Sequence, residues 1–173
     1  MVELLISRSY PLAVVFSKIS LKIPFLLAGT RVRPIPTSSP RMKTMTIHPA
    51  GHPPSRGAYS PGVKVELAGG GTVLFATGQL AVDTDGRVVA PFEATAQTEY
   101  VFKLIGSILA EAGMNFSNVV RTQTFLTNMA DFERFSEVRN RYFGAARPAS
   151  TLLEVKGLAK EGCCVEIEVT AMK

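Results

Sequence analysis

Two carboxylates near the end of the chain, Glu166 and Glu168, alternate with apolar residues over positions 165–169. Successive side chains of a β-strand point to opposite faces, so a strand here places both carboxylates on one face and Val165 and Ile167 on the other. A carboxylate in a partly dehydrated cleft has a raised pKa and can take or give a proton near neutral pH. The alternative is a solvated sheet face on which both carboxylates are only surface charges.

The chain offers few histidine and cysteine residues for catalysis or metal binding. The two histidines, His48 and His52, precede the expected start of the domain near residue 54, which predicts no Ser-His or Cys-His pair and no zinc site in the folded part. Cys163 and Cys164 are adjacent, which is typical of free thiols in a reducing compartment. Three consecutive glycines at 69–71 lack the Gly-Lys-Ser/Thr of a phosphate loop and indicate a hairpin turn.

The elements that would position these groups follow from residue periodicity. Apolar residues at helical spacing predict a helix over 92–112, ended by Gly113, and a second helix that Asp131 caps. We expect Phe132, Phe135, Val138 and Tyr142 to form the inner stripe of that second helix, with Glu137 and Arg141 paired on its outer surface. Strands are expected over 63–67, 72–77, 87–89, 119–126, 151–155 and 163–172. This order predicts an α+β fold, an antiparallel or mixed sheet with two helices packed on one face.

The net charge of +5 is unevenly distributed along the 173 residues. Residues 1–44 hold seven Lys/Arg and one acidic residue, whereas the remainder carries 12 basic and 13 acidic residues. Since a nucleic-acid-binding domain carries its positive charge on the folded part, we expect no nucleic-acid partner. We therefore divide the chain into a basic N-terminal extension, 1–53, and a domain, 54–173.

The N-terminal extension has short apolar runs interrupted by Lys18, Lys22 and prolines. None approaches the roughly 18 apolar residues of a membrane span, so no membrane partner is expected. Few acids and scattered Arg and Ser favour a transit peptide and a mitochondrial or other organellar location. The alternative is a cytoplasmic protein that begins at Met42 or Met45.

Four segments together resemble one family. They are residues 57–61 (Gly-Ala-Tyr-Ser-Pro), 77–79 (Thr-Gly-Gln), 147–155 (Arg-Pro-Ala-Ser-Thr-Leu-Leu-Glu-Val) and 165–169 (Val-Glu-Ile-Glu-Val). In this order and spacing they are similar to the RidA/YjgF (L-PSP-type) family. The resemblance covers about residues 57–172. It implies a chorismate-mutase-like fold, a homotrimer with clefts between subunits, and hydrolysis of reactive enamines and imines without a metal or cofactor.

The resemblance also implies roles for single residues. Tyr59 matches the tyrosine that closes the cleft, Thr77 stands where many members have serine, and Gly78 lets backbone approach the ligand. Glu166 matches the carboxylate that positions and polarises the attacking water. Ser150 replaces the arginine that binds a substrate carboxylate, and Leu152 replaces a cysteine or threonine.

Ala130 further replaces a polar residue near the second helix. These departures predict a smaller, more apolar or uncharged ligand. They leave two functions open: a RidA-like enzyme for small enamine, imine or related carbonyl metabolites, and a trimer that binds a metabolite without turnover. RNA cleavage, an activity attached to some members, is disfavoured by the charge of the domain and its lack of histidine.

Overall fold

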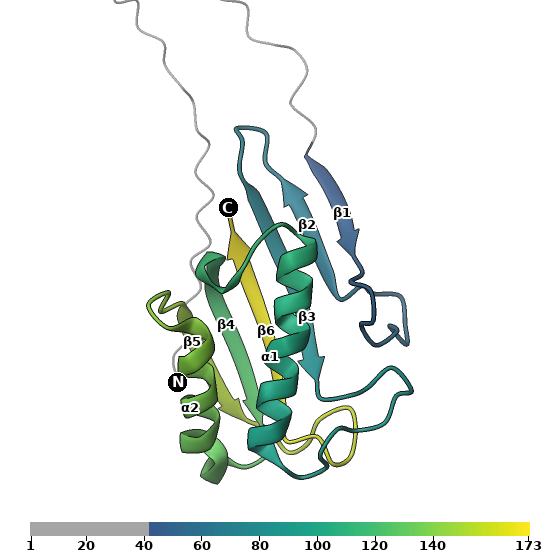
Figure 1. Cartoon of the computed structure of the whole chain (residues 1–173), viewed down its shortest axis with the longest axis vertical. Coiled ribbons are helices and arrows are strands. Elements are labelled where there is room, and N and C mark those ends of the chain that lie inside the picture. Colours follow the sequence, from purple (N-terminus) through teal and green to yellow (C-terminus); the bar gives the residue numbers. More distant parts are fainter. Residues whose placement is uncertain (1–41) are drawn as a thin grey trace, which may run out of the picture. The chain divides into compact units, whose positions relative to one another are not determined.

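The computed structural model describes residues 42–173, and the expected transit peptide lies outside them. Six strands form one sheet in the order β1-β2-β3-β6-β4-β5, in which only the pairing of β4 with β5 is parallel. Two helices lie on one face of this sheet (Figure 1), which confirms the predicted α+β fold. The strands are β1 Lys43–Ile47, β2 Gly62–Glu66, β3 Thr72–Leu80, β4 Val119–Leu126, β5 Ala149–Glu154 and β6 Val165–Met172; the helices are α1 Ala94–Glu111 and α2 Phe132–Phe143, with short 3-10 turns at Phe116–Asn118 and Met129–Asp131.

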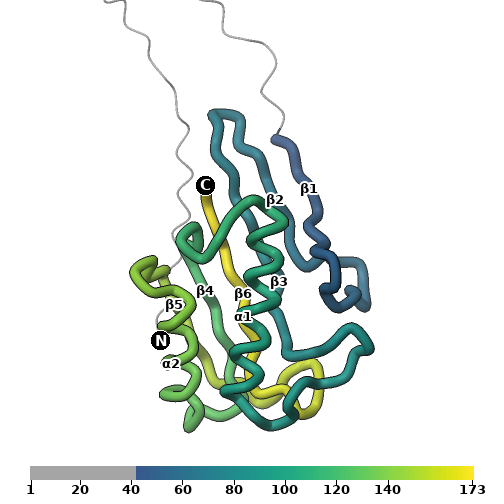
Figure 2. Tube along the Cα trace, in the orientation of Figure 1, coloured from purple at the N-terminus to yellow at the C-terminus, as the bar shows by residue number. Residues whose placement is uncertain are grey.

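The sheet begins earlier than the sequence indicated. Strand β1 pairs with β2 through the whole register from Lys43↔Glu66 to Ile47↔Gly62, so an edge strand precedes the expected start of the domain at residue 54. The trace in Figure 2 shows this strand beside β2 at the outer edge of the sheet. The segment between β1 and β2, which holds His48 and His52, therefore belongs to the folded part of the chain. The inference that the folded part contains no imidazole was wrong.

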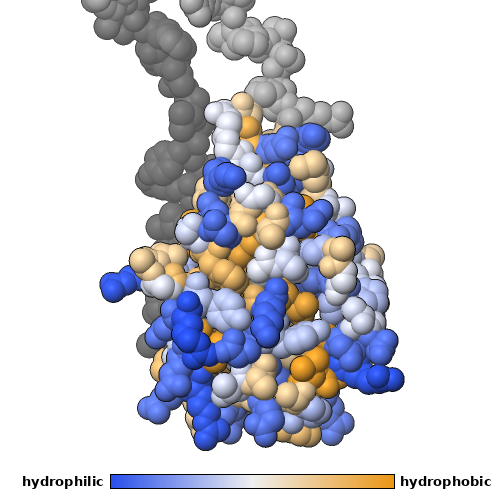
Figure 3. Space-filling model, viewed as in Figure 1, coloured by the Kyte–Doolittle hydropathy of each residue, from blue (hydrophilic) through white to orange (hydrophobic). Residues whose placement is uncertain are grey.

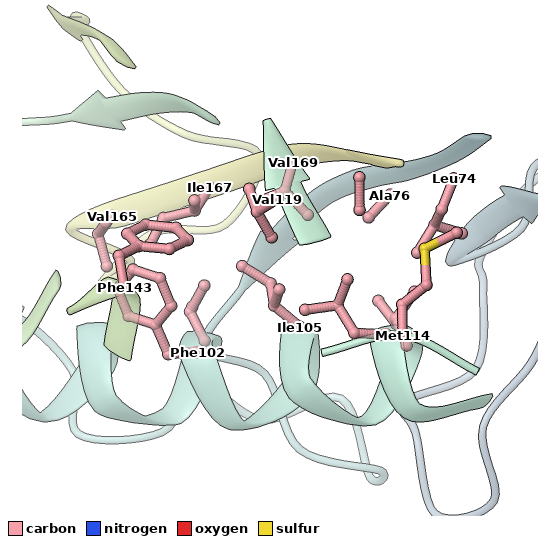
Figure 4. Packing of buried hydrophobic residues seen from close by; sticks show 14 of the residues in the cluster. Leu74, Ala76, Phe102, Ile105, Met114, Val119, Phe143, Val165, Ile167 and Val169 are labelled. Atoms are coloured by element: carbon pink, nitrogen blue, oxygen red, sulfur yellow. The ribbon is translucent and has the colours of Figure 1, made fainter. Parts of the chain in front are cut away.

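Helix α1 covers the centre of the sheet and supplies more residues to the hydrophobic core than any other element. Its apolar face, which includes Phe102 and Ile105, packs against the apolar face of β6 and against Leu74 of β3 (Figure 4). The helix ends at Glu111 with Ala112 as its C-cap, and Gly113 then takes a φ of +75°, in agreement with the stop that the sequence predicted. The alternation expected for β6 is confirmed, because Val165, Ile167 and Val169 are buried and Glu166 and Glu168 are only half-buried.

Helix α2 differs from the expectation in three respects. Phe132 is 42% exposed, so the inner stripe begins at Phe135. Asp131 makes no capping hydrogen bond with its side chain. Arg141 forms an ion pair with Glu99 of α1 and not with Glu137, because α1 lies close enough to offer a carboxylate that also accepts from the Tyr142 hydroxyl. The outward surface of α2 is hydrophilic (Figure 3).

The second face of the sheet carries no helix in residues 42–173. Phe75 of β3 and Leu153 of β5 are each 52% exposed, and in the register they share this face with Glu166, Glu168 and Thr170 of β6. We call it the uncovered face. Within this part of the chain no helix is long and apolar enough to cross a membrane.

Candidate active site

Glu166 lies near the beginning of β6, between two other strands of the sheet. Its register partners are Leu80 of β3 and Phe125 of β4, and its side chain is half-buried on the uncovered face. Burial raises the pKa of the Glu166 carboxyl above its ordinary value, and repulsion from Glu168 raises it further. The carboxyl is therefore poised to hold a proton at a higher pH than an exposed glutamate.

Gly78 makes room for this carboxylate. The pairing of β3 with β6 shifts register between Ala76 and Gln79, so Gly78 sits in a bulge beside Glu166. A Cβ atom on Gly78 would overlap the Glu166 Oε1 atom and come within 2.9 Å of its Cδ atom. The absence of a Cβ atom at Gly78 therefore lets β3 approach the Glu166 side chain closely, and a larger residue would displace one of the two.

Gly78 also lines a cavity of about 380 Å³, a volume in the range of small-ligand sites. The cavity lies between the segment that follows β1, the end of β3 and the loop before β6. Its lining includes His52, Arg56, Tyr59, Gly78, Gln79 and Lys160. The structure therefore brings Tyr59 and Gly78 together at one cavity. Glu166 contacts Gly78 but does not line this cavity.

Hydrogen bonds join the two chain segments that form one wall of this cavity, the segment before β2 and the end of β3. The His52 Nε2 atom lies 2.9 Å from Gln79 Oε1, and Gln79 Nε2 donates to the backbone oxygen of Thr77 at 2.8 Å. The Thr77 hydroxyl donates to the backbone oxygen of Ser60 at 2.8 Å. These bonds tie the chain before β2 to the bulge of β3, so Thr77 acts on the cavity by holding its wall. Tyr59 is 56% exposed at the rim.

Ser150 and Leu152 do not reach this cavity within one chain. Their register partners on β4 are Thr122 and Thr124, which in turn pair with the core-facing Val169 and Ile167. Both side chains therefore lie on the helix-covered side of the sheet, opposite Glu166. Leu152 packs against the core, and Ser150 lines a separate groove beside α2. The expectation of one cleft holding all six residues is not met in the single chain.

Sequence reasoning missed the polar residues of the cavity wall. His52 was set aside because the domain was placed too late, and Arg56 and Lys160 belong to loops whose path the sequence pattern does not give. The one signal in the sequence was Gln79, a polar residue just beyond the expected strand 72–77. The structure buries its side chain to 5% exposure, so the amide needs a hydrogen-bond partner.

Thiol and metal chemistry find no support in the described residues. Both cysteines are buried, and burial raises the pKa of each thiol, which disfavours the reactive thiolate. Residues 42–173 contain no group of three metal-ligating side chains.

The sequence also matches a family model described as Endoribonuclease L-PSP over residues 50–173. The chain belongs to the RidA/YjgF family. It is 33% identical over 125 residues to the 3-aminoacrylate deaminase RutC of Acinetobacter baylyi, a match that covers 72% of this chain and 94% of the relative. It is 31% identical over 121 residues to the 2-iminobutanoate/2-iminopropanoate deaminase of Mus musculus, which covers 70% of this chain and 85% of the relative.

A solved structure places the fold in the same family. The crystal structure of RidA from the Antarctic bacterium Psychrobacter sp. PAMC 21119 aligns with a TM-score of 0.65 at 32% identity, covering 73% of this chain and 98% of that one. The RidA/YjgF resemblance drawn from four short segments is thereby confirmed for fold and family.

Proposed function

We propose that this RidA/YjgF protein hydrolyses small reactive enamines, imines or related carbonyl metabolites. The observation that carries the proposal is the half-buried Glu166 carboxyl with its raised pKa, which lies on the uncovered face against Gly78, a residue that also lines a cavity of small-ligand size. Two relatives at 33% and 31% identity are named for the deamination of an enamine acid and of imino acids.

The chemistry needs one group that can both accept and donate a proton. Water adds to the carbon of the C=N bond while a carboxylate takes its proton, and the nitrogen is protonated. Collapse of the resulting aminoalcohol breaks the C–N bond, releases ammonia and leaves a C=O group. Glu166 fits the role of proton acceptor and donor because the raised pKa brings its two protonation states closer in free energy at neutral pH.

We further propose that the protein is a homotrimer, in which the uncovered face is buried between subunits. The exposed Phe75 and Leu153 on that face support association, since large apolar side chains gain free energy when they leave water. Ser150 and Leu152 lie on the other side of the sheet, but β5 is an edge strand, so a cleft at the boundary between two subunits offers a way for them to approach Glu166 of a neighbouring subunit.

The second candidate function is binding of a metabolite without turnover. It is favoured by Ser150 and Ala130, which stand where the resemblance predicts an arginine and a polar side chain. A serine offers a neutral hydrogen bond in place of a bidentate ion pair, so substrate positioning would be weaker.

The Glu166→Gln variant separates the two functions. For an enzyme we expect turnover of a small enamine or imine to fall at least about a hundredfold with little change in ligand affinity, because a general acid–base group contributes roughly 10²–10⁴ in rate. A Glu168→Gln variant, changed two residues along the same strand, should keep most of the activity. Unchanged turnover in Glu166→Gln, or a change in affinity alone, would favour the binding protein.

A further inference from the structure

His52 donates a hydrogen bond to a side chain of β3 whose orientation is already fixed. The Gln79 Nε2 atom donates to the backbone oxygen of Thr77 at 2.8 Å, which sets the direction of the amide group. The Gln79 Oε1 atom then faces His52 Nε2 at 2.9 Å, and an amide oxygen can only accept. The Nε2 atom of His52 therefore carries the hydrogen of this bond, while Nδ1 lies 3.0 Å from the backbone oxygen of Pro53.

Gln79 needs this donor because its side chain is only 5% exposed. A buried amide oxygen without a hydrogen-bond partner costs free energy. Rotation of the amide toward another donor would give up the bond to the Thr77 backbone oxygen. His52 thus holds the Gln79 amide, and the Gln79 amide holds the Thr77 carbonyl.

Thr77 belongs to the bulge of β3, where the pairing with β6 shifts register between Ala76 and Gln79. Its N–H donates to the backbone oxygen of Pro61 at 3.0 Å, and its hydroxyl donates to that of Ser60 at 2.8 Å. Together with the bond from Gln79, three polar groups of Thr77 are therefore held by β3 itself and by the segment before β2. The conformation of the bulge depends on these bonds.

The bulge is also the part of β3 against which the Glu166 side chain rests. The Glu166 Cγ and Cδ atoms lie 3.1 and 2.9 Å from the point at which a Cβ atom of Gly78 would stand. At such close packing, a small movement of Gly78 toward β6 displaces the carboxyl, and a movement away lets it turn toward solvent. The position of the carboxyl thus depends on the position of the bulge.

His52 and Glu166 act on the bulge from opposite sides of the sheet. Gln79, which accepts from His52, shares the helix-covered side with its register partner Ile167. Glu166 lies on the uncovered face. The route from the imidazole to the carboxyl therefore runs through the Gln79 amide and the backbone of residues 77–78.

We propose that His52 is a positioning residue for Glu166, because its hydrogen bond to Gln79 fixes the β3 bulge and the bulge keeps the carboxyl partly out of water. The effect of His52 on turnover rests on the proposed function. Its effect on the proton equilibrium of Glu166 does not, so the two can be tested separately.

Substitutions at position 52 leave the other charged groups in place. Glu166 shares the uncovered face with Glu168 of β6 and Arg121 of β4, and β3 contains no charged residue. The charged side chains that line the cavity together with His52 are Arg56, Asp83 and Lys160.

His52→Gln and His52→Asn form a matched pair. The amide nitrogen of glutamine reaches the place of the imidazole Nε2 atom and keeps a donor for Gln79. The shorter asparagine reaches only the place of Nδ1 and loses that donor. Neither amide is charged, so the pair separates the hydrogen bond from any charge on the imidazole. His48→Gln is the control, because His48 is an exposed histidine of the same segment.

Carbon-13 NMR of the Glu166 carboxyl follows its titration in the full chain, with the signal assigned by its loss in Glu166→Gln. We expect the midpoint to fall by at least about half a pH unit in His52→Asn, because a carboxyl released into water ionises more readily. His52→Gln and His48→Gln should titrate as the parent does. Turnover of 2-iminobutanoate should fall roughly tenfold in His52→Asn, in kcat more than in KM.

A purely structural role for the hydrogen bond predicts a different result. His52→Asn would then lower the melting temperature and leave the Glu166 midpoint at its parental value, which would overturn the proposal. Equal shifts in His52→Gln and His52→Asn would overturn it as well. His52→Ser is a second variant without the donor, so the result does not depend on the folding of one protein. A lowered midpoint in a protein without turnover would support the positioning role and count against the proposed function.

Discussion

Glu166 is the residue on which the proposed chemistry depends, and its surroundings should be visible in stability as well as in rate. Burial and the neighbouring Glu168 raise the pKa of its carboxyl in the folded state. The folded protein therefore binds this proton more tightly than the unfolded chain, whose glutamates have a pKa near 4.3. Stability is lost as the pH rises through the pKa of the folded state, because the ionised carboxyl is disfavoured there.

The Glu166→Gln variant should accordingly melt at a higher temperature than the parent at pH 7. The difference should shrink as the pH falls and vanish below about pH 4, where the carboxyl is neutral in both states. Thermal unfolding followed by circular dichroism from pH 3.5 to 8 measures this. Glu161→Gln, at an exposed loop position, is the control. Parallel pH profiles for the parent and Glu166→Gln would contradict the raised pKa.

Gly78→Ala tests whether close approach of β3 to the carboxylate matters. The added methyl group would overlap Glu166, so either the side chain or the bulge must move. We expect a loss of about 1–3 kcal/mol in the free energy of unfolding together with a marked fall in turnover. Gly69→Ala is a matched control, because nothing lies within 4 Å of its added Cβ atom. Equal behaviour of the two variants in denaturant titrations would show that the bulge is not constrained.

At the scale of residues, the sequence identifies those whose signal is local. Glu166 follows from strand alternation and from the match to the family pattern, and its half-burial on the uncovered face agrees with both. The separation of Ser150 from Glu166 could not be predicted, because the sequence does not show which residues of β5 point to the helix-covered side of the sheet. This orientation depends on the pairing register of β5 with β4, which neither strand encodes alone.

Among the elements, one buried side chain joins three segments that surround the candidate site. Gln97 of α1 is fully buried, donates to the backbone oxygens of Ala90 and Gly162 at 3.0 and 2.7 Å, and accepts from the Cys164 backbone N–H at 2.6 Å. It fixes the beginning of α1 against the loop that leads into β6. Because Glu166 follows this loop closely, these hydrogen bonds also help to hold Glu166 in place.

Gln97→Leu should therefore destabilise the protein by about 2–4 kcal/mol, because it removes these hydrogen bonds and leaves buried backbone groups unpaired. Chemical denaturation gives the free energy, and hydrogen exchange at Cys164 reports the local opening. Thr95→Leu, at an exposed position of the same helix, should cost little. A Gln97→Leu variant as stable as the parent would show that water or backbone movement replaces the bonds.

Helices and strands with a clear spacing of apolar residues were predicted well. Elements and contacts that depend on a neighbouring element were not. Strand β4 was placed at its observed residues and α1 within two residues at its N-terminus, because apolar spacing marks a helix or strand without reference to its neighbours. Strand β1 was missed because a five-residue edge strand has little pattern of its own and forms on β2. The pairing of Arg141 with Glu99 likewise depends on the packing of α2 against α1.

For the whole molecule, the uncovered face is the feature that a single chain leaves unexplained. If it is the interface of the proposed homotrimer, a charge in its centre should prevent assembly. Phe75→Glu is expected to yield monomers in size-exclusion chromatography with light scattering, since burial of an unpaired carboxylate is strongly unfavourable. Phe132→Glu, an exposed apolar position on the helix side, should leave assembly intact. A parent protein that is monomeric at micromolar concentration would contradict the proposed trimer.

The most direct test of the proposed function is ammonia release from freshly generated 2-iminobutanoate, measured for the full chain beside the Ser150→Arg and Glu166→Gln variants. The account predicts release faster than spontaneous hydrolysis in the parent and a return to the spontaneous rate in Glu166→Gln. It also predicts a further increase of about tenfold in Ser150→Arg, from an added bidentate ion pair with the substrate carboxylate. Spontaneous rates in both the parent and Ser150→Arg would contradict an imine hydrolase and leave a metabolite-binding protein.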